Sequence, residues 1–238
     1  MRRCALFVLI IFLFFSALSC VAQQDYIARY SVFTAFSYLS TPSLNLAQRG
    51  FDGDVGVNLR PWLTLGADFS YQSGHSSLLP GSLSSSAQAK LAPILPLLPP
   101  GFVLAVPFNS RTWTYEAGPQ FNYRKEKNFT YFARPALGAF HSAFSAQPGQ
   151  CQQPQLHCAA IITKIVSGLV GPSLSSSDTV VFYGFGGGVT WEATHNFGLR
   201  IAADYVRYNF FSDLLNGSRG SVRVTVGTKF SFGKNIVK

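Results

Sequence analysis

Apolar and polar positions alternate strictly near the end of the chain, in SVRVTVGTKFSF (residues 221–232). The valines and phenylalanines fall on one side, whereas Arg223, Lys229 and small residues fall on the other. A period of two places successive side chains on opposite faces of a β-strand. Such a strand either buries its apolar face in a soluble core, or turns that face toward lipid and points its cations inward.

The same two-faced pattern occurs seven more times and predicts eight strands, at residues 30–38, 51–59, 62–71, 112–123, 129–141, 180–192, 197–205 and 221–232. Roughly 9–11 residues of tilted strand cross a bilayer. Tight turns follow the second, fourth and sixth strands, and longer loops follow the others, at about residues 41–50, 74–110, 143–178 and 209–219. Short turns at one end and long loops at the other are typical of an outer-membrane barrel with both termini in the periplasm.

The polar side of nearly every predicted strand carries a charge, and both signs occur. A charge facing lipid at the bilayer midplane costs about 2–4 kcal/mol, whereas opposite charges inside a narrow barrel can pair. We therefore predict that the valines of residues 221–232 face lipid and that the charges line the lumen. The predicted lumen charge network consists of Asp52, Asp54, Asp68, Glu116, Arg134, Glu192, Arg200, Asp204, Arg223 and Lys229.

Aromatic residues fall near the ends of the predicted strands. Amphipathic rings gather where a barrel meets the lipid headgroups. The residues that we assign to this aromatic girdle are Trp62, Trp113, Tyr123, Trp191 and Tyr208.

The N-terminus carries the pattern of an export signal. Arg2 and Arg3 precede an apolar run over residues 5–18, and small residues lead to a cleavage position after Ala22. This predicts a signal peptide over residues 1–22 and a barrel domain over residues 23–238. An uncleaved membrane anchor and a lipidated Cys20 are the alternatives.

Composition agrees with export into a membrane. Charged residues make up 12% of the chain and aromatic residues 15%, against about 25% charged in soluble domains. The formal charge is +9, but the cations do not cluster, so we expect no nucleic acid partner. Outer-membrane lipids and anionic lipopolysaccharide are the expected surroundings.

Five segments, taken in their order along the chain, resemble the small outer-membrane barrels of the OmpA/OmpX type. They are VFTAFSYLS, LRPWLTLGADFSY, YEAGPQFNYRKEKNFTYFARPALGAFHS, FGGGVTWEATHNFGLRIAADYVRYNF and VRVTVGTKFSFG. They are particularly similar to the outer membrane protein beta-barrel domain proteins of Gram-negative bacteria. The resemblance covers nearly the whole chain after residue 22, apart from the two longest loops. It implies an all-β, eight-stranded, antiparallel up-and-down transmembrane β-barrel. It also implies that the barrel-assembly machinery reads the last strand, although residues 233–238 follow its terminal Phe232.

Two cysteines remain outside the predicted signal, Cys151 and Cys158. In an oxidising compartment they are expected to form a disulfide. A metal site would need more ligands than these two and His157, so we predict no metal site, and no cofactor is expected.

An eight-stranded barrel has an interior that side chains fill, and the predicted inner residues Phe132 and Phe140 favour a closed lumen. We therefore expect a monomeric, non-catalytic protein with a structural or surface-interaction role, in which apolar loops bind a surface ligand or pack together as a lid. The first alternative is a narrow, porin-like channel for small solutes. The second is a barrel enzyme that modifies lipid A or phospholipid, with His141 as the residue to test.

Overall fold

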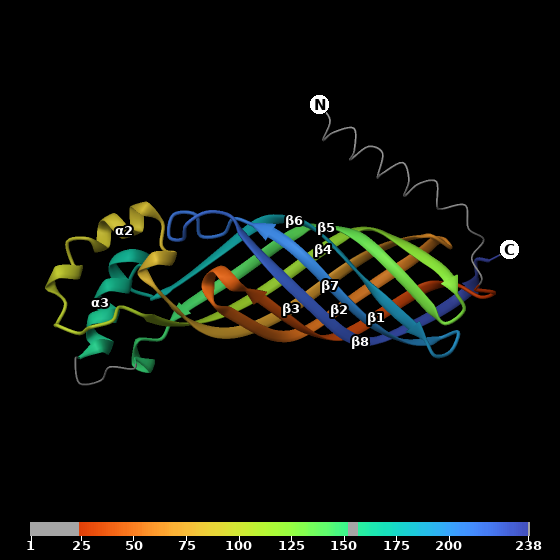
Figure 1. Cartoon of the computed structure of the whole chain (residues 1–238), viewed down its shortest axis with the longest axis horizontal. Helices are drawn as coiled ribbons and strands as arrows, with labels where there is room; N and C mark the ends of the chain where they lie inside the picture. Colours follow the sequence, from red (N-terminus) through yellow and green to blue (C-terminus); the bar gives the residue numbers. More distant parts are fainter. Residues whose placement is uncertain (1–23, 152–156, 238) are drawn as a thin grey trace, which may run out of the picture.

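Eight strands form one closed barrel in the computed structural model, which describes residues 24–151 and 157–237 (Figure 1). Each strand pairs antiparallel with its neighbours in chain order, and β1 pairs with β8. The strands are β1 Ala28–Thr41, β2 Leu46–Arg60, β3 Leu63–Leu78, β4 Val106–Glu126, β5 Phe129–Ala146, β6 Ser175–Glu192, β7 Phe197–Tyr208 and β8 Arg219–Asn235. The predicted fold class is confirmed. The predicted signal peptide lies outside the described residues.

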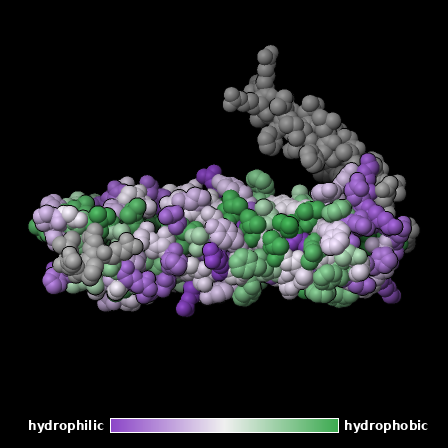
Figure 2. All heavy atoms as spheres, turned by 60° about the horizontal axis from the view of Figure 1, so that its bottom comes forward, coloured by the Kyte–Doolittle hydropathy of each residue, from purple (hydrophilic) through white to green (hydrophobic). Residues whose placement is uncertain are grey.

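The polarity of the barrel is the reverse of that of a soluble protein. Apolar side chains such as Phe36, Phe185 and Val226 are exposed on the outside, at 58%, 68% and 52%. The inward positions are polar, and Asp204 and Ser221 are completely buried. Figure 2 shows the apolar side chains gathered over the middle of the barrel, with hydrophilic residues beyond them toward one end. Only lipid makes such an exterior favourable, and closure leaves no unpaired edge in the membrane.

The strand SVRVTVGTKFSF has its apolar side toward lipid. Val222, Val226 and Phe230 are 39%, 52% and 49% exposed, whereas Arg223 and Lys229 are buried inside. The chain is therefore an outer-membrane β-barrel protein. No helix in the described part of the chain is long and apolar enough to cross a bilayer.

Tight turns join β2 to β3, β4 to β5 and β6 to β7 at one end of the barrel, where β1 also starts and β8 ends. This short-turn end corresponds to the periplasmic side. Of the four predicted loops, the one at residues 41–50 is wrong. The β1–β2 ladder continues to Thr41 opposite Leu46, so the connection is a single 3₁₀ turn, η2 Pro42–Leu44. Leu46 and Gln48 point inward and extend the hairpin.

The two longest loops are shorter than predicted because their flanking strands extend past the lipid-facing belt. β3 runs to Leu78 and β4 starts at Val106; β5 runs to Ala146 and β6 starts at Ser175. The described parts of these connections, residues 79–105, 147–151 and 157–174, contain short helices, which lie together beyond the barrel (Figure 1). These are η3 Pro80–Ser82, α2 Ser85–Leu91, η4 Leu95–Leu97, η5 Pro148–Gln150 and α3 Cys158–Val170.

We call this region the extracellular lobe: residues 79–105, 147–151, 157–174 and 209–218. Its apolar residues pack against one another and against the upper barrel. Ile162 is completely buried, and Leu83, Leu91 and Leu215 are nearly so. The same apolar cluster continues into the barrel mouth through Phe140, Phe182 and Val206. The lobe therefore closes the extracellular end as an apolar plug.

Four of the five residues assigned to the aromatic girdle project outward. Trp62, Tyr123 and Trp191 are exposed, and Trp113 is half-exposed against the ring of Tyr71.

The assignment of Tyr208 to the girdle is wrong, because its side chain is buried inside the barrel. Its ring stacks on Phe140 with centroids 4.2 Å apart, and its hydroxyl hydrogen-bonds with Thr41 and Ser221. The physical reason is the strand period: Tyr208 lies four residues after Asp204, on the same inward side of β7.

Candidate functional site

The lumen is the densest collection of charged side chains in the described part of the chain. All ten predicted lumen residues point inward, and their side chains are at most 14% exposed in the ion pairs that they form. They divide into a central cluster and a second group near the periplasmic end.

Arg223 is the centre of the first cluster. Its Nη1 donates to Asp68 Oδ1 at 2.8 Å, and its Nη2 donates to Glu116 Oε2 at 3.0 Å and Asp204 Oδ2 at 2.9 Å. Asp52 Oδ2 lies 3.3 Å from Nη1. β8 thus supplies one guanidinium to four carboxylates that come from β2, β3, β4 and β7, and this arrangement ties opposite walls of the barrel together.

Arg134, on β5, is the second cation of the central cluster. It donates through Nε and Nη2 to both oxygens of Asp204, at 3.0 and 2.9 Å, and through Nη2 to Asp68 at 3.3 Å. Asp54 Oδ2 is 3.6 Å from its Nη1. A bidentate arginine–carboxylate pair holds both partners in one geometry, so this cluster is rigid.

Arg200 lies between the central cluster and the periplasmic end. It pairs with Asp54 at 3.7 Å and donates to Thr190 at 3.1 Å. Its guanidinium carbon lies 5.0 Å from the ring centre of Phe33 and 4.8 Å from that of Phe132. Cation–π contacts of this kind fix a guanidinium against aromatic rings. Arginine and rings together fill the cross-section at this level.

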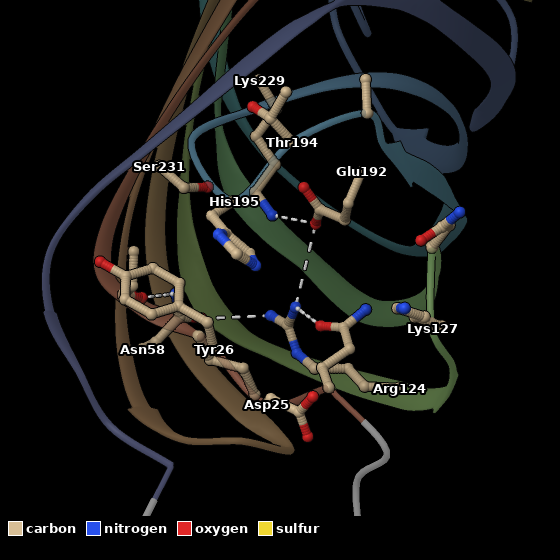
Figure 3. Close-up of a pocket in the computed structure, with 15 residues that line it drawn as sticks. Asp25, Tyr26, Asn58, Arg124, Lys127, Glu192, Thr194, His195, Lys229 and Ser231 are labelled. Atoms are coloured by element: carbon tan, nitrogen blue, oxygen red, sulfur yellow. Dashed lines mark hydrogen bonds and ion pairs between the residues drawn. The ribbon is translucent and has the colours of Figure 1, made fainter.

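The periplasmic end holds an open cavity of about 330 Å³, which we call the vestibule. Figure 3 shows Glu192 between Lys229 and Arg124 on its wall. Lys229 Nζ donates to Glu192 Oε1 at 2.6 Å, and Arg124 Nη1 lies 3.9 Å from the same oxygen. Two buried cations therefore share one carboxylate at the edge of solvent.

Arg124 is a lumen residue that the sequence analysis missed. It is 6% exposed and donates to Pro61 O at 2.9 Å, to Gln24 Oε1 at 3.2 Å and to Thr130 Oγ1 at 3.1 Å. The signal was present: Arg124 lies eight residues after Glu116 and so has the same inward parity. The predicted strand stopped at Tyr123, whereas β4 continues through Arg124 to Glu126.

Cys151 and Cys158 are joined by a disulfide in the extracellular lobe, far from the lumen charges. Cys158 is the first residue of α3 and is buried, so the bond fixes the start of this helix to the η5 turn.

His141 faces outward from β5. Its ring lies 5.3 Å from that of Trp113, and its Nδ1 is 2.7 Å from Thr179 Oγ1. Among the described residues, no group of three or more histidine, cysteine, aspartate or glutamate side chains is arranged to hold a metal ion.

No protein-family model matches the chain, and no curated protein matches its sequence. Among solved structures, it is similar to Ail, the attachment invasion locus protein of Yersinia pestis, at 14% identity and a TM-score of 0.42, covering 87% of this chain and 100% of Ail. Neisserial surface protein A has 13% identity and a TM-score of 0.46, with 85% and 96% covered.

OprG from Pseudomonas aeruginosa has 8% identity and a TM-score of 0.47, with 90% of this chain and 100% of OprG covered. Likenesses this distant assign no activity to the chain. Its architecture is established by its own strand pairing and reversed polarity.

Proposed function

We propose that this outer-membrane protein is a non-catalytic barrel whose extracellular lobe binds an external surface. The observation that carries the proposal is the exposed tip of the lobe, residues 93–103. Leu97 is 81% exposed, Val103 61% and Leu95 42%, while Leu91 and Leu104 on either side are anchored in the apolar core. The tip is an apolar projection on a fixed base.

The surroundings of the tip support a binding role. Exposed apolar clusters rimmed by polar residues are typical of interaction surfaces. Pro93, Pro96, Pro99 and Pro100 restrict the backbone of the tip, and a segment that is already ordered loses less conformational entropy on binding. Other apolar residues of the lobe, among them Leu91, Leu104 and Ile162, are buried in its core, so one lobe can serve both as a lid and as a binding surface.

The test replaces the exposed leucines and leaves the lobe core untouched. We expect the double substitution Leu95→Asn/Leu97→Asn to reduce adhesion of expressing cells to one another and to an apolar surface by about fivefold or more. The matched control is Ser173→Asn/Ser175→Asn, two exposed positions where the lobe joins β6. Unchanged adhesion in the leucine variant, or an equal loss in the control, would refute the proposal.

A lipid-modifying enzyme is the second candidate, favoured by the hydrogen bond between His141 and Thr179 on the lipid-facing wall. In a nucleophilic site, a histidine hydrogen-bonds to the hydroxyl that it activates, and a third group orients the histidine. However, no carboxylate in the described part of the chain hydrogen-bonds to His141 to orient its ring. We expect lipid A and phospholipids from cells expressing the protein to have the same masses as those from cells expressing His141→Ala. A mass difference would favour the enzyme.

The narrow-channel alternative requires a passage through the charge clusters. The rings around Arg200 and the buried Phe140 and Phe182 occupy the cross-section. We therefore expect no steady conductance from the purified protein in a planar bilayer. Discrete, persistent openings would favour a channel over a binding protein.

A further inference from the structure

The vestibule of Figure 3 has no part in surface binding, and it lies at the opposite end of the barrel from the lobe. Its volume of about 330 Å³ is within the range of about 300–1,000 Å³ for small-molecule sites. Its wall carries polar and charged side chains and comes from residues 24–27, five strands and two turns. Asn58, Arg124, Glu192, Lys229 and Ser231 line it from the strands.

Charge is unbalanced in the vestibule. Arg124 and Lys229 are 6% and 4% exposed, and Glu192 is the one carboxylate of the described residues that pairs with them. At the rim, Lys127 and Asp25 carry opposite charges and cancel. One positive charge is therefore left over next to the cavity. Buried charges are costly unless they are paired, so an anion that entered here would be stabilised.

Hydrogen-bonding capacity is also left over. A lysine ammonium has three N–H donors, and among the described residues Lys229 uses one, to Glu192. The Arg124 fork is held by Pro61, Gln24, Thr130 and a 3.5 Å contact of Nη2 with Asn58 Oδ1. The guanidinium of Arg124 is thus held in place by its partners, whereas two N–H groups of the Lys229 ammonium remain available to a ligand.

We propose that the vestibule is a binding site for a small carboxylate from the periplasm. One carboxylate group carries the single negative charge that balances the site, whereas a phosphate dianion would add excess negative charge beside Glu192. In this site Lys229 donates directly to the ligand carboxylate, and Arg124 supplies fixed charge behind it. His195 and Tyr26, with ring centres 5.2 Å apart, form one side of the entrance and contact the apolar part of the ligand.

The carboxylate could belong to a free solute or to the end of a peptide. Two probes separate these sources: N-acetylglycine represents the solute, and N-acetyl-tetraalanine represents a peptide C-terminus. N-acetylglycinamide, which lacks the charge, is the neutral control. Titration of the full-length protein in detergent micelles, followed by calorimetry, measures each dissociation constant.

We expect N-acetylglycine to bind at least tenfold more tightly than its amide. Lys229→Gln should weaken binding about tenfold, whereas Lys234→Gln, on the exposed tail of the same strand, should leave it unchanged. Tighter binding of the peptide than of N-acetylglycine assigns the site to peptide ends; the reverse assigns it to free solutes. Binding of the amide as tightly as the acid, or of inorganic phosphate more tightly than either, overturns the proposal.

Misfolding of Lys229→Gln would also weaken binding, so a second variant is needed for which we expect tighter binding. Glu192→Gln keeps the shape of the side chain and removes the competing carboxylate, so binding of N-acetylglycine should become several-fold tighter. A closed barrel resists detergent until it is boiled, so the gel band of the folded protein shifts on heating, and this heat-dependent gel shift reports folding. Absence of binding in the wild type contradicts a carboxylate site. A larger dissociation constant for a Glu192→Gln variant that keeps the gel shift contradicts it as well.

Discussion

The two ends of the barrel are closed by opposite chemistry. At the extracellular end, the opening is filled by buried apolar side chains of the lobe, such as Ile162, together with Phe140 and Phe182 of the barrel mouth. At the periplasmic end, a polar vestibule stays open to water and is lined by Arg124, Glu192 and Lys229. Between the two ends, Arg223 of the central cluster joins β8 to carboxylates of four other strands. From this contrast we expect solutes to approach the lumen from the periplasmic end.

The comparison also separates stability from binding. An apolar plug stabilises through area removed from water, and it has little to offer a small polar ligand. A half-open polar cavity contributes little to stability because water can replace its contacts, but it can hold an anion. We therefore expect substitutions to have effects that depend on the region in which they fall.

The largest effect is expected at the centre. Arg223→Met would leave Asp52, Asp68, Glu116 and Asp204 with one guanidinium fewer, and removing one partner of a buried pair costs about 3–5 kcal/mol. Urea unfolding, monitored by the heat-dependent gel shift, measures this loss. The control is Arg207→Gln, an exposed arginine of β7, which should change stability by about 0.5 kcal/mol or less. Equal effects of the two variants would mean that the central cluster does not hold the walls together.

The next effect is expected in the plug. Ile162 is completely buried on α3, and replacing a buried isoleucine by alanine costs about 2–5 kcal/mol. Because the lobe lies outside the barrel, we expect Ile162→Ala to speed proteolysis within residues 79–105 while the gel shift of the barrel persists. Lys164→Ala, at an exposed position of the same helix, is the control. A barrel that unfolds together with the lobe would show that the two regions are one cooperative unit.

The smallest effect is expected in the vestibule. Lys229→Gln removes one partner of Glu192, but Arg124 remains beside that carboxylate and the cavity admits water. We expect a loss of about 1–2 kcal/mol, the lower part of the range for a buried polar group that loses one of its partners, by the same urea measurement. A loss of stability as large as that of Arg223→Met would show that the vestibule stabilises the barrel as much as the central cluster does.

Local pattern predicted the barrel well because strand geometry is local. A period of two is enough to decide which side of a strand faces lipid, so the ten lumen charges could be assigned from residue parity alone. The errors at Tyr208 and Arg124 came from the strand limits, since both residues continue the parity of Asp204 and Glu116. The loop predicted at residues 41–50 failed for another reason: Leu46 pairs with Thr41 and Gln48 pairs with Leu39 across a hairpin, and the pairing of two strands is not visible in the pattern of one.

The sequence by itself determined the strands, their two faces and the reversed polarity that places the chain in a membrane. Tertiary structure decided which carboxylate meets which guanidinium, because partners such as Asp68 and Arg223 come from strands on opposite walls and meet only through the tilt and register of the closed barrel. It also decided that the apolar loops form a plug and that two cations share Glu192. These outcomes depend on distances between residues far apart in the chain, and no local period encodes those distances.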